Sequence, residues 1–488
     1  MQVRNILLNN FANNIKMLTV CCRPDDEGAL AKLFGAEDRD PFVFAAPGVK
    51  GAALQSEELS AISDAAHVGN SLKLAPQKKI TNLLKNKQTR KNSYMLLARG
   101  NGLSYNDCCF NHDGIIVDMG RLNHLLSFDK QSGILICQGS TTFADLFLVS
   151  PNFIPPVIPG TIKATVAGGI AHDIHGKNNG LAGSFGRHIQ WLDLLLSNKQ
   201  LLRCSPHENV KLFYATIAGL GLTGIITRIA IKMTKASHFV AVQTEKNYDF
   251  TTLIARMQQL DTTYEYQVAW LDLIKERSIL SLANSINHET INRTANCIAN
   301  SSYQLPKLPF PLINFNLIKL LNQYYFHKTQ PSLKILPLKL FNNPLDLISN
   351  YGRLYGKNGF IQFQAVFSAS AALETIQELM SIINATRAQP TLAVLKLFSQ
   401  AGTGLLSFVQ PGFTIAIDFI NNDMAHKAIL TMNKLITKIN GKIYLAKDLF
   451  LTAMQFSKQY PNCEQFKQII AEINSQMRSD LSRRLKVH

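Results

Sequence analysis

A chain of 488 residues is too long for one compact core, so we expect at least two domains. The hydrophobic fraction of 46% and the mean hydropathy of +0.02 are typical of a globular protein. No apolar run reaches the roughly 18 residues of a membrane-spanning helix, and we predict no secretory leader. The net charge of +17 favours an anionic partner, but no zinc finger, RNP motif or helix-turn-helix spacing supports nucleic acid. A phosphate-bearing ligand or an acidic membrane surface remains.

The eight cysteines are scattered and form no C-x-x-C motif. They therefore predict neither a metal site nor a disulfide framework. We expect reduced thiols and a cytoplasmic protein, with peripheral contact at the inner face of the cytoplasmic membrane as a further expectation.

The first half of the chain predicts an irregular extension followed by a domain of short strands and helices. Residues 1–75 are broken repeatedly by Gly and Pro, and residues 78–87 have the apolar spacing of an amphipathic helix. The expected strands are 94–98, 114–118, 133–137, 191–196 and 225–233, with a helix at 142–148. We therefore predict an α+β domain over residues 76–235.

After residue 236 glycine becomes sparse and longer helical patterns appear. The expected helices are 250–260, 371–384 and 423–438, and the expected strands are 360–367, 393–398 and 413–419. We predict a second domain of antiparallel sheet and helices over 236–445. A helical C-terminal segment, 446–488, is expected to return to the first domain.

One apolar stretch, residues 305–340, is rich in Pro, Leu, Ile and Phe and also contains several Lys. We interpret it as part of a mobile cover near 295–345, or as a surface that touches lipid or a substrate tail. The alternative is an irregular segment that packs into the core.

Three Gly-rich loops point to a ligand that packs against bare backbone. The first, Arg99–Asp107, reads RGNGLSYND, follows a strand and lacks the third Gly of a Rossmann fingerprint. The second runs from PGT at 159–161 through DIHGKN at 173–178 to GSFG at 183–186, and the third is GLGLTGII at 219–226. Successive backbone N–H groups in such loops can hold a pyrophosphate.

Three such loops at this spacing resemble the FAD-binding oxidoreductases of the vanillyl-alcohol oxidase type. Within that superfamily the chain looks most like the decaprenylphosphoryl-β-D-ribose oxidases, which are the flavin subunits of a ribose-to-arabinose epimerase. VLKLF at 394–398 and YLAKD at 444–448 carry the likeness into the second domain. The resemblance implies a two-subdomain, PCMH-type FAD-binding domain followed by a substrate domain.

The resemblance assigns FAD binding to the Gly-rich loops. Some relatives hold FAD covalently through a His at the position of Leu103, which has no nucleophilic atom, so the resemblance implies non-covalent FAD. The residues expected to contact FAD are Arg99, Gly100, Asn101, Gly102, Leu103, Ser104, Tyr105, Pro159, Gly160, Thr161, Thr165, Gly168, Gly169, Asp173, His175, Gly176, Asn178, Gly183, Ser184, Gly221, Gly224, Ile225 and Ile226.

Lys447 is the first expected catalytic residue, because the resembled oxidases need a Lys near the flavin ring at this position of YLAKD. The alternative is a surface Lys at the start of a helix. Lys396, in an alternating apolar run, is expected to bind a substrate phosphate or hydroxyl unless it faces solvent. Gln362 and Gln364 share one strand face, which lines the sugar site or is solvated.

His175 is the second expected catalytic residue, because it lies in the Gly-rich region where it could orient flavin or sugar or act as general base. The alternative is a structural His. Tyr105 is expected to contact the flavin or the substrate, with ordinary packing as its alternative. Asn342 stands where the resembled oxidases have a Tyr in the cover, and we expect it to contact substrate. Thr414 and Ala416 replace an Asn and a Cys of the resembled pocket, which puts the identity of the sugar and lipid in doubt.

Taken together, we expect FAD-dependent oxidation of a sugar secondary alcohol. The substrate implied by the resemblance is the 2′-hydroxyl of a polyprenyl-phosphoryl ribose, with a short-chain reductase partner that completes epimerisation for cell-wall arabinan. One alternative is a soluble aldonolactone or alditol oxidase that uses oxygen. The other is a flavin-binding protein that has lost activity.

Overall fold

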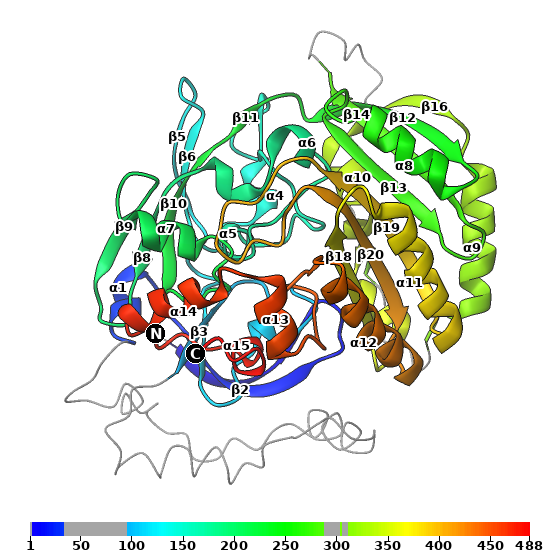
Figure 1. Ribbon diagram of the computed structural model, residues 1–488. Helices are drawn as coiled ribbons and strands as arrows, with labels where there is room; N and C mark the ends of the chain where they lie inside the picture. Colours follow the sequence, from blue (N-terminus) through cyan, green and yellow to red (C-terminus); the bar gives the residue numbers. More distant parts are fainter. Residues whose placement is uncertain (1, 34–94, 287–302, 305–310) are drawn as a thin grey trace.

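The computed structural model describes residues 2–33, 95–286, 303–304 and 311–488. Two halves lie side by side in Figure 1, the first blue to green and the second green to orange, with the red C-terminal helices below them. The helix predicted at 78–87 and part of the cover predicted near 295–345 lie outside the described residues. The mixed architecture confirms the predicted α+β class.

The first sheet has the order β1-β2-β4-β3. Strands β1 and β2 are antiparallel, whereas the pairs β2–β4 and β4–β3 are parallel. Its strands are β1 (Gln2–Asn9), β2 (Lys16–Arg23), β3 (Leu96–Arg99) and β4 (Ile115–Asp118). A short helix, α1 (Glu27–Ala31), follows with Asp26 as its N-cap.

The prediction of an irregular extension was therefore wrong for residues 2–33. The edge strand β1 is almost wholly exposed and so lacks the apolar alternation by which strands are recognised. Its stability comes from the ladder of hydrogen bonds to β2, which is a tertiary contribution.

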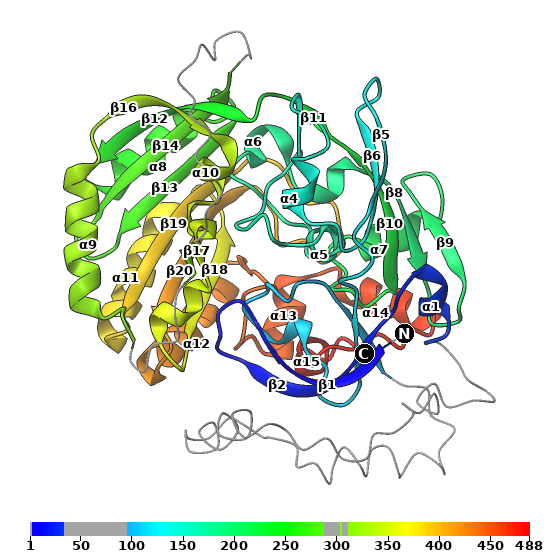
Figure 2. The same ribbon diagram turned by 180° about the vertical axis from the view of Figure 1, so that it is seen from behind.

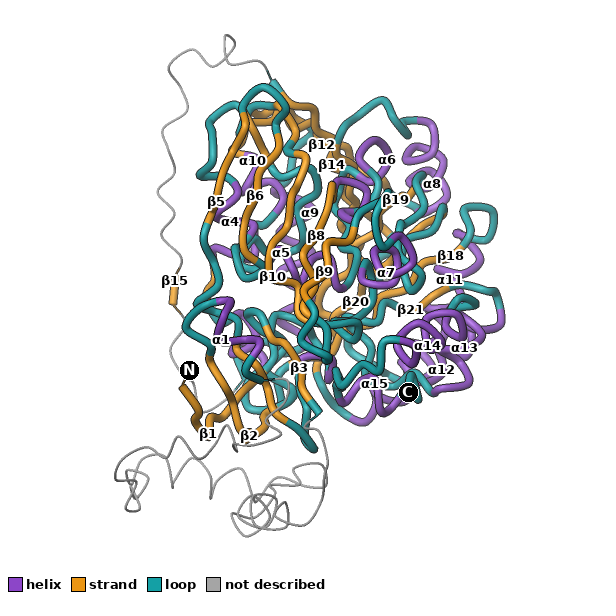
Figure 3. Tube along the Cα trace, turned by 90° about the vertical axis from the view of Figure 1, so that its left-hand side faces the viewer, coloured by secondary structure: helices purple, strands orange, loops and turns teal. Residues whose placement is uncertain are grey.

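The second sheet is antiparallel and has the order β5-β6-β10-β8-β9. Figure 3 shows it above the first sheet. Its strands are β5 (Leu125–Asp129), β6 (Ile134–Gln138), β8 (Ile189–Leu195), β9 (Leu201–Cys204) and β10 (Ile225–Lys232). The short elements that accompany it are α4 (Phe143–Leu146), β7 (Phe153–Ile154), α5 (Val166–Ala171), α6 (Asn179–Ala182), α7 (Val210–Thr216) and β11 (Thr234–Lys235).

The third sheet is antiparallel throughout, with the order β16-β12-β14-β13-β19-β20-β18-β21. Its strands are β12 (Phe239–Asn247), β13 (Tyr266–Asp272), β14 (Arg277–Ser285), β16 (Ser332–Pro337), β18 (Phe360–Phe367), β19 (Pro390–Phe398), β20 (Gly412–Ile420) and β21 (Lys442–Ile443). Three amphipathic helices cover its outer face, namely α8 (Phe250–Gln259), α11 (Ala372–Thr386) and α12 (Asp423–Lys438) (Figure 2).

The two faces of this sheet differ because successive side chains of a strand point in opposite directions. In β20, Phe413, Ile415, Ile417 and Phe419 join the apolar core with α11 and α12. The alternate positions, including Thr414, Ala416 and Asp418, therefore face the first half of the molecule. Strands β18 and β19 pair with β20 in register, so their polar residues reach that same inner face.

The described part of the apolar stretch 305–340 is regular structure. It contains α9 (Phe315–Lys328), whose N-cap is Asn314, then β16, then the start of α10 (Leu338–Asn342). The short elements around it are β15 (Tyr303–Gln304), η5 (Pro344–Leu347), β17 (Ile348–Ser349) and η6 (Tyr351–Tyr355). Pairing of β16 with β12 fixes this stretch at the edge of the third sheet.

The three C-terminal helices are α13 (Ala453–Gln459), α14 (Cys463–Glu472) and α15 (Asp480–Arg484). Two of them, α14 and α15, pack against the first half, and α13 contacts α12 of the second half. The chain before α15 exchanges backbone hydrogen bonds with Leu96 of β3, and the Asp480 N–H donates to the Phe110 carbonyl at 2.9 Å. Within the described ranges, none of the helices has the length and hydropathy needed to cross a bilayer.

Candidate active site

A cavity of about 1050 Å³ lies between the Gly-rich loops of the first half and the inner face of the third sheet. It extends from Gly100 to the end of α9 and the inner side of β16. This volume is at the upper end of the range for ligand pockets, about 300–1,000 Å³, so it suits a large ligand or two ligands together.

One wall is bare backbone. A Cβ on Gly160 or on Gly221 would meet no protein atom within 4 Å, so both glycines present backbone to the cavity. Gly102 and Gly221 have φ values of +62° and +72°, which a side chain would strain. Thr165 caps α5 through Gly168 N–H, and a Cβ on Gly100 would lie 2.3 Å from its Oγ1. The loops therefore form a tight cradle in which N–H groups can face an anionic ligand.

The lining as a whole is cationic. Among its described residues are five lysines and one acid, Asp346, whose carboxylate accepts from Thr161 Oγ1 at 2.6 Å and from Ile162 N–H at 2.9 Å. The lysines are Lys177, Lys328, Lys334, Lys396 and Lys447. Burial lowers the pKa of Lys177 to about 7, with a further contribution from Lys396, and burial lowers the pKa of Lys396 to about 8. An anionic ligand would stabilise the charged form of each.

Lys447 lies in a turn held by backbone hydrogen bonds. Its N–H donates to the Tyr444 carbonyl, and the Tyr105 N–H donates to the Ala446 carbonyl at 3.0 Å. Its Nζ lies 3.0 Å from the centroid of the Tyr105 ring, in cation–π geometry. Burial lowers the pKa of Lys447, the charge of Asp418 opposes this, and the charge of Lys396 adds to it. The amine can therefore exchange a proton near neutral pH.

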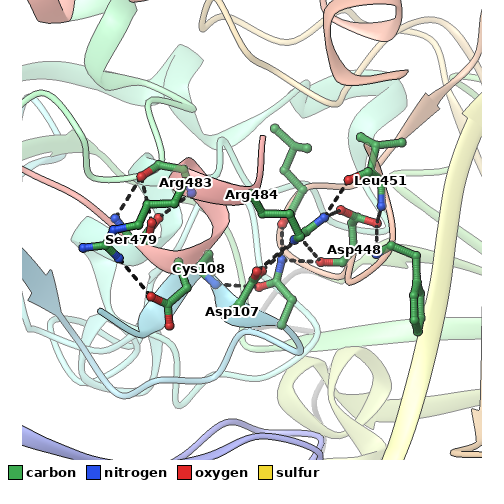
Figure 4. Close-up of polar contacts among 12 residues, drawn as sticks. Asp107, Cys108, Asp448, Leu451, Ser479, Arg483 and Arg484 are labelled. Carbon is green, nitrogen blue, oxygen red and sulfur yellow. Dashed lines mark hydrogen bonds and ion pairs between the residues drawn. The ribbon is translucent and has the colours of Figure 1, made fainter. Parts of the chain in front are cut away.

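An ion-paired cluster fixes the loop that carries Lys447 (Figure 4). Arg484 of α15 binds both carboxylate oxygens of Asp107, at 2.9 and 3.0 Å, and also Asp448 Oδ2 at 2.9 Å. Asn106 Nδ2 adds hydrogen bonds to the carbonyls of Leu445 and Asp448. The end of the first Gly-rich loop and the YLAKD turn are thus joined by one guanidinium from the C-terminal helix.

His175 is enclosed by three aromatic rings, those of Phe398, Phe408 and Tyr444, at centroid distances of 4.9 to 5.5 Å. Burial lowers its pKa well below the usual range, and the charges of Lys396 and Lys447 lower it further. Its Nε2 lies 3.0 Å from Gln364 Nε2, which can donate to the unprotonated nitrogen. In this arrangement His175 is a neutral acceptor that orients the Gln364 amide.

The turn between β1 and β2 reaches the cavity. Phe11 lines it, contacts the Tyr105 ring in a tilted arrangement with centroids 4.9 Å apart, and donates its N–H to the Ser104 carbonyl at 3.1 Å. Asn14 Nδ2 donates to the Phe360 carbonyl of β18 at 2.8 Å. The N-terminal residues therefore connect the first Gly-rich loop to the third sheet.

Comparisons with known proteins agree with this geometry. A family model described as FAD binding domain matches residues 86–205. The chain is 30% identical over 411 residues to decaprenylphosphoryl-β-D-ribose oxidase of Mycolicibacterium smegmatis, and the match covers 80% of this chain and 89% of that protein. The chain belongs to the family of this oxidase.

Two further relatives are more distant. An uncharacterized protein in the mprA 5′ region of Streptomyces coelicolor is 24% identical over 364 residues, 70% of this chain and 98% of that protein. D-arabinono-1,4-lactone oxidase of Yarrowia lipolytica is 34% identical over 116 residues, only 24% of this chain and 22% of that protein.

As a member of the decaprenylphosphoryl-ribose oxidase family, the chain is an FAD-dependent oxidoreductase. The cradle fits that cofactor, because Gly160 and Gly221 leave room for a ligand and Ser104 presents a buried Oγ without a hydrogen-bond partner. Of the residues expected at the site, those that line the cavity are Gly100, Asn101, Gly102, Leu103, Ser104, Tyr105, Pro159, Gly160, Thr161, Thr165, Gly168, Gly169, His175, Gly221, Gly224, Ile225, Ile226, Asn342, Gln362, Gln364, Lys396 and Lys447.

Six residues expected to contact FAD do not line the cavity, namely Arg99, Asp173, Gly176, Asn178, Gly183 and Ser184. The Asp173 carboxylate accepts from Gly186 N–H, Thr403 N–H and Ser407 Oγ at 2.7 to 2.9 Å. The Arg99 guanidinium donates to the Asn9 carbonyl, and Asn178 Nδ2 donates to that of Pro156. These three side chains therefore hold the loops in place by hydrogen bonds and do not face the cavity.

The sequence analysis did not assign four residues that the structure brings to the site. Lys177, inside DIHGKN, lines the cavity and donates to the Phe341 carbonyl at 2.6 Å. His172 and Trp270 also line the cavity, and Asp418 lies behind Gln362. An inward charged residue in an apolar strand was the available indication for Asp418, since a buried carboxylate needs a partner.

Family departures lie on the inner face of β20. Thr414 is buried and lies 3.4 Å from Gln364 Nε2, and Ala416 lines the cavity. Asn342, at the end of α10, has a buried Nδ2 without a hydrogen-bond partner. Thr414 and Ala416 belong to β20 and Asn342 to α10, whereas Lys447 lies in the turn after β21.

Proposed function

We propose that the chain oxidises the 2′-hydroxyl of a polyprenyl-phosphoryl ribose to the 2′-keto sugar. Bound FAD supplies the hydride acceptor, at N5 of its ring system. The name of the M. smegmatis relative gives the substrate class. The observation that carries the proposal is the cavity lining, which contains five lysines and one acid, Asp346, that is already hydrogen-bonded. Such a lining suits a ligand with a phosphate group as well as the FAD pyrophosphate.

In this proposal Lys447 takes the hydroxyl proton. Its low pKa supplies neutral amine near pH 7, whereas the Nε2 of His175 is occupied by Gln364. Gln362 and Gln364 orient the sugar hydroxyls from one face of β18, and Lys177 and Lys396 hold the phosphate. FAD is bound without a covalent bond, because Leu103 occupies the position of the linking His.

The lipid part suggests a contact with the membrane surface. Helix α9 exposes Leu317, Leu320, Leu321 and Tyr324, which share one face by their spacing. The C-terminal end of the same helix contributes Tyr325 and Lys328 to the cavity lining. We infer that an acidic bilayer meets α9 peripherally and that the prenyl chain leaves the cavity there. A partner reductase would then complete epimerisation of the keto sugar.

The experiment is anaerobic reduction of the flavin, followed by its visible absorbance. Polyprenyl-phosphoryl ribose should bleach the flavin, whereas ribose without the lipid phosphate should not. The matched control is polyprenyl-phosphoryl arabinose, which differs only in the configuration at the oxidised carbon. Rapid bleaching by the free sugar alone contradicts the proposal.

A soluble aldonolactone or alditol oxidase is the second candidate. The similarity to the Y. lipolytica lactone oxidase favours it, although that match covers only 24% of this chain. Such substrates are uncharged and would leave the low-pKa lysines without an anion. Turnover of a lactone or an alditol with oxygen, at a kcat/KM above that of the lipid-linked sugar, would establish this candidate instead.

A further inference from the structure

A buried carboxylate, that of Asp418, lies on the inner face of β20 and is 2% exposed. It is directly opposite Gln362 in the β18–β20 ladder, and Gln362 Nε2 donates to its Oδ1. Among the described residues no Arg or Lys nitrogen makes a close ion pair with this carboxylate. A buried carboxylate without a close cation is costly unless another positive charge compensates it.

The charged group that acts on this carboxylate most directly is Lys447. Burial raises the pKa of Asp418, and its hydrogen bond from Gln362 and the charge of Lys447 oppose that rise. The effect is reciprocal, because Asp418 raises the pKa of Lys447 against burial and against Lys396. Gln362, which holds the carboxylate, lines the same cavity as Lys447. The two groups therefore attract across a medium of low dielectric constant.

The other titratable groups around the pair do not offer an alternative anion at neutral pH. Burial raises the pKa of Tyr105, of Tyr351 and of Tyr355, so all three phenols stay neutral. The remaining groups that face Lys447 are Lys396, Cys108, His172 and His175, and burial keeps the thiol and both imidazoles neutral. Asp346, the acid in the cavity lining, accepts from Thr161 and Ile162 and is not among the charges that act on Lys447. Asp418 is thus the anion that acts on Lys447 inside the site.

We propose that Asp418 is a positioning residue for the proton transfer, the counter-ion that stabilises the ammonium form of Lys447. The inference rests on the proposed role of Lys447 as base. In the step, the substrate O–H bond breaks and an N–H bond forms on Lys447. The C–H bond breaks with its electron pair going to the flavin, and a C=O bond forms. The Asp418 carboxylate balances the new positive charge, while Gln362 holds it in place.

The variant Asp418→Asn tests this, since it removes the charge and keeps an oxygen that can accept from Gln362. Without the anion, burial and Lys396 should lower the pKa of Lys447 further. The rate depends on neutral amine, so the acid limb of the kcat–pH profile should move to lower pH by about one unit, equivalent to about a tenfold change in the proton affinity of Lys447. The plateau kcat should fall, because the ammonium product is less stable. Asp423→Asn, an exposed carboxylate on α12, is the matched control and should change neither.

A second readout does not need substrate. The pH dependence of Lys447 acetylation, followed by mass spectrometry of its peptide in the FAD-loaded protein and in the protein without FAD, reports its pKa. Asp418→Asn should lower that pKa. Loss of kcat with an unchanged Lys447 pKa overturns the inference and makes Asp418 structural, and so does an unchanged profile. If Asp418→Asn fails to fold, Gln362→Met replaces it. Loss of this hydrogen bond should favour protonated Asp418 and lower the Lys447 pKa in the same direction.

The same pair of readouts separates this inference from the proposed function. If lipid-linked ribose is not oxidised, the labelling result still stands or falls on its own. If Lys447→Ala keeps most of the wild-type kcat while Asp418→Asn shifts the labelling pKa, then the pairing is real and Lys447 is not the base.

Discussion

The two walls of the cavity are built by opposite means. The wall from the first half is backbone, with glycines that leave space and N–H groups that can face an anion. The wall from the third sheet is made of side chains: Gln362, Gln364 and Lys396 alternate with apolar core residues along strands that pair with β20, and Asp418 lies behind Gln362. The first wall is suited to a fixed cofactor. In the second wall, single substitutions can change which ligand groups are bound. Departures such as Ala416 accordingly lie on the second wall.

The two walls should respond differently to substitution, and Lys447→Ala should have the largest effect. Removal of a general base lowers kcat by roughly 10²- to 10⁴-fold, while the backbone cradle should keep its FAD. The measurement is the rate of anaerobic flavin reduction together with the flavin content. Lys434→Ala, an exposed lysine on α12, is the matched control. Loss of FAD along with activity would show that Lys447 also contributes to FAD binding, contrary to this contrast between the walls.

Lys396→Met should have an intermediate effect, mainly on substrate binding. A charge-assisted hydrogen bond contributes roughly 1.5–3 kcal/mol, so KM for the phosphorylated substrate should rise about 10- to 100-fold with a smaller change in kcat. In the wild type, KM should also rise with pH as Lys396 loses its proton near its pKa of about 8, and the variant should lack this dependence. Steady-state kinetics from pH 6 to 9 measure both, with exposed Lys427→Met as control. An unchanged KM would mean that the phosphate binds elsewhere.

Gly221→Ala should have the smallest effect and should act on the other wall. The φ of +72° costs a residue with a Cβ roughly 1–2 kcal/mol, and the new methyl group projects into the cavity. FAD affinity should fall about tenfold for a loss of about 1.4 kcal/mol. The flavin released into the supernatant by acid precipitation measures FAD content, and its release also tests non-covalent binding. Gly133→Ala, at φ +66° outside the cavity lining, should lower the Tm similarly but retain FAD.

Much of the backbone wall could be predicted because its information is local. Gly100, Gly102 and the PGT and GLGLTGII loops are contiguous motifs, and each needs glycine for a reason that holds within a few residues. The same holds for Lys447, whose turn is set by YLAKD. Within the motifs, the prediction of FAD contact failed for some side chains. Asp173 and Arg99 belong to the loops, but their side chains bind other parts of the protein and do not line the cavity.

The side-chain wall and the N-terminal region could be predicted only in part. Lys396 and the two glutamines were recognised as inward candidates from alternation. The partner of Gln362 was not, because strand register decides that Asp418 faces it. Lys177 comes from a loop of the first half, and only the tertiary structure brings it into the same cavity as Lys396. The exposed strand β1 gave no apolar pattern, so the contact of Phe11 with Tyr105 was not foreseen.

The sequence by itself determined the class of cofactor and the Gly-rich loops that line the cavity, because glycine torsions and short motifs act over neighbouring residues. Its assignment of Lys447 to the chemistry is a prediction of the same local kind. Only the tertiary structure decided which charges meet. Residues far apart in the chain meet through strand pairing, through the turn between β1 and β2, and through the ion pairs of Arg484. Burial then sets their pKa values.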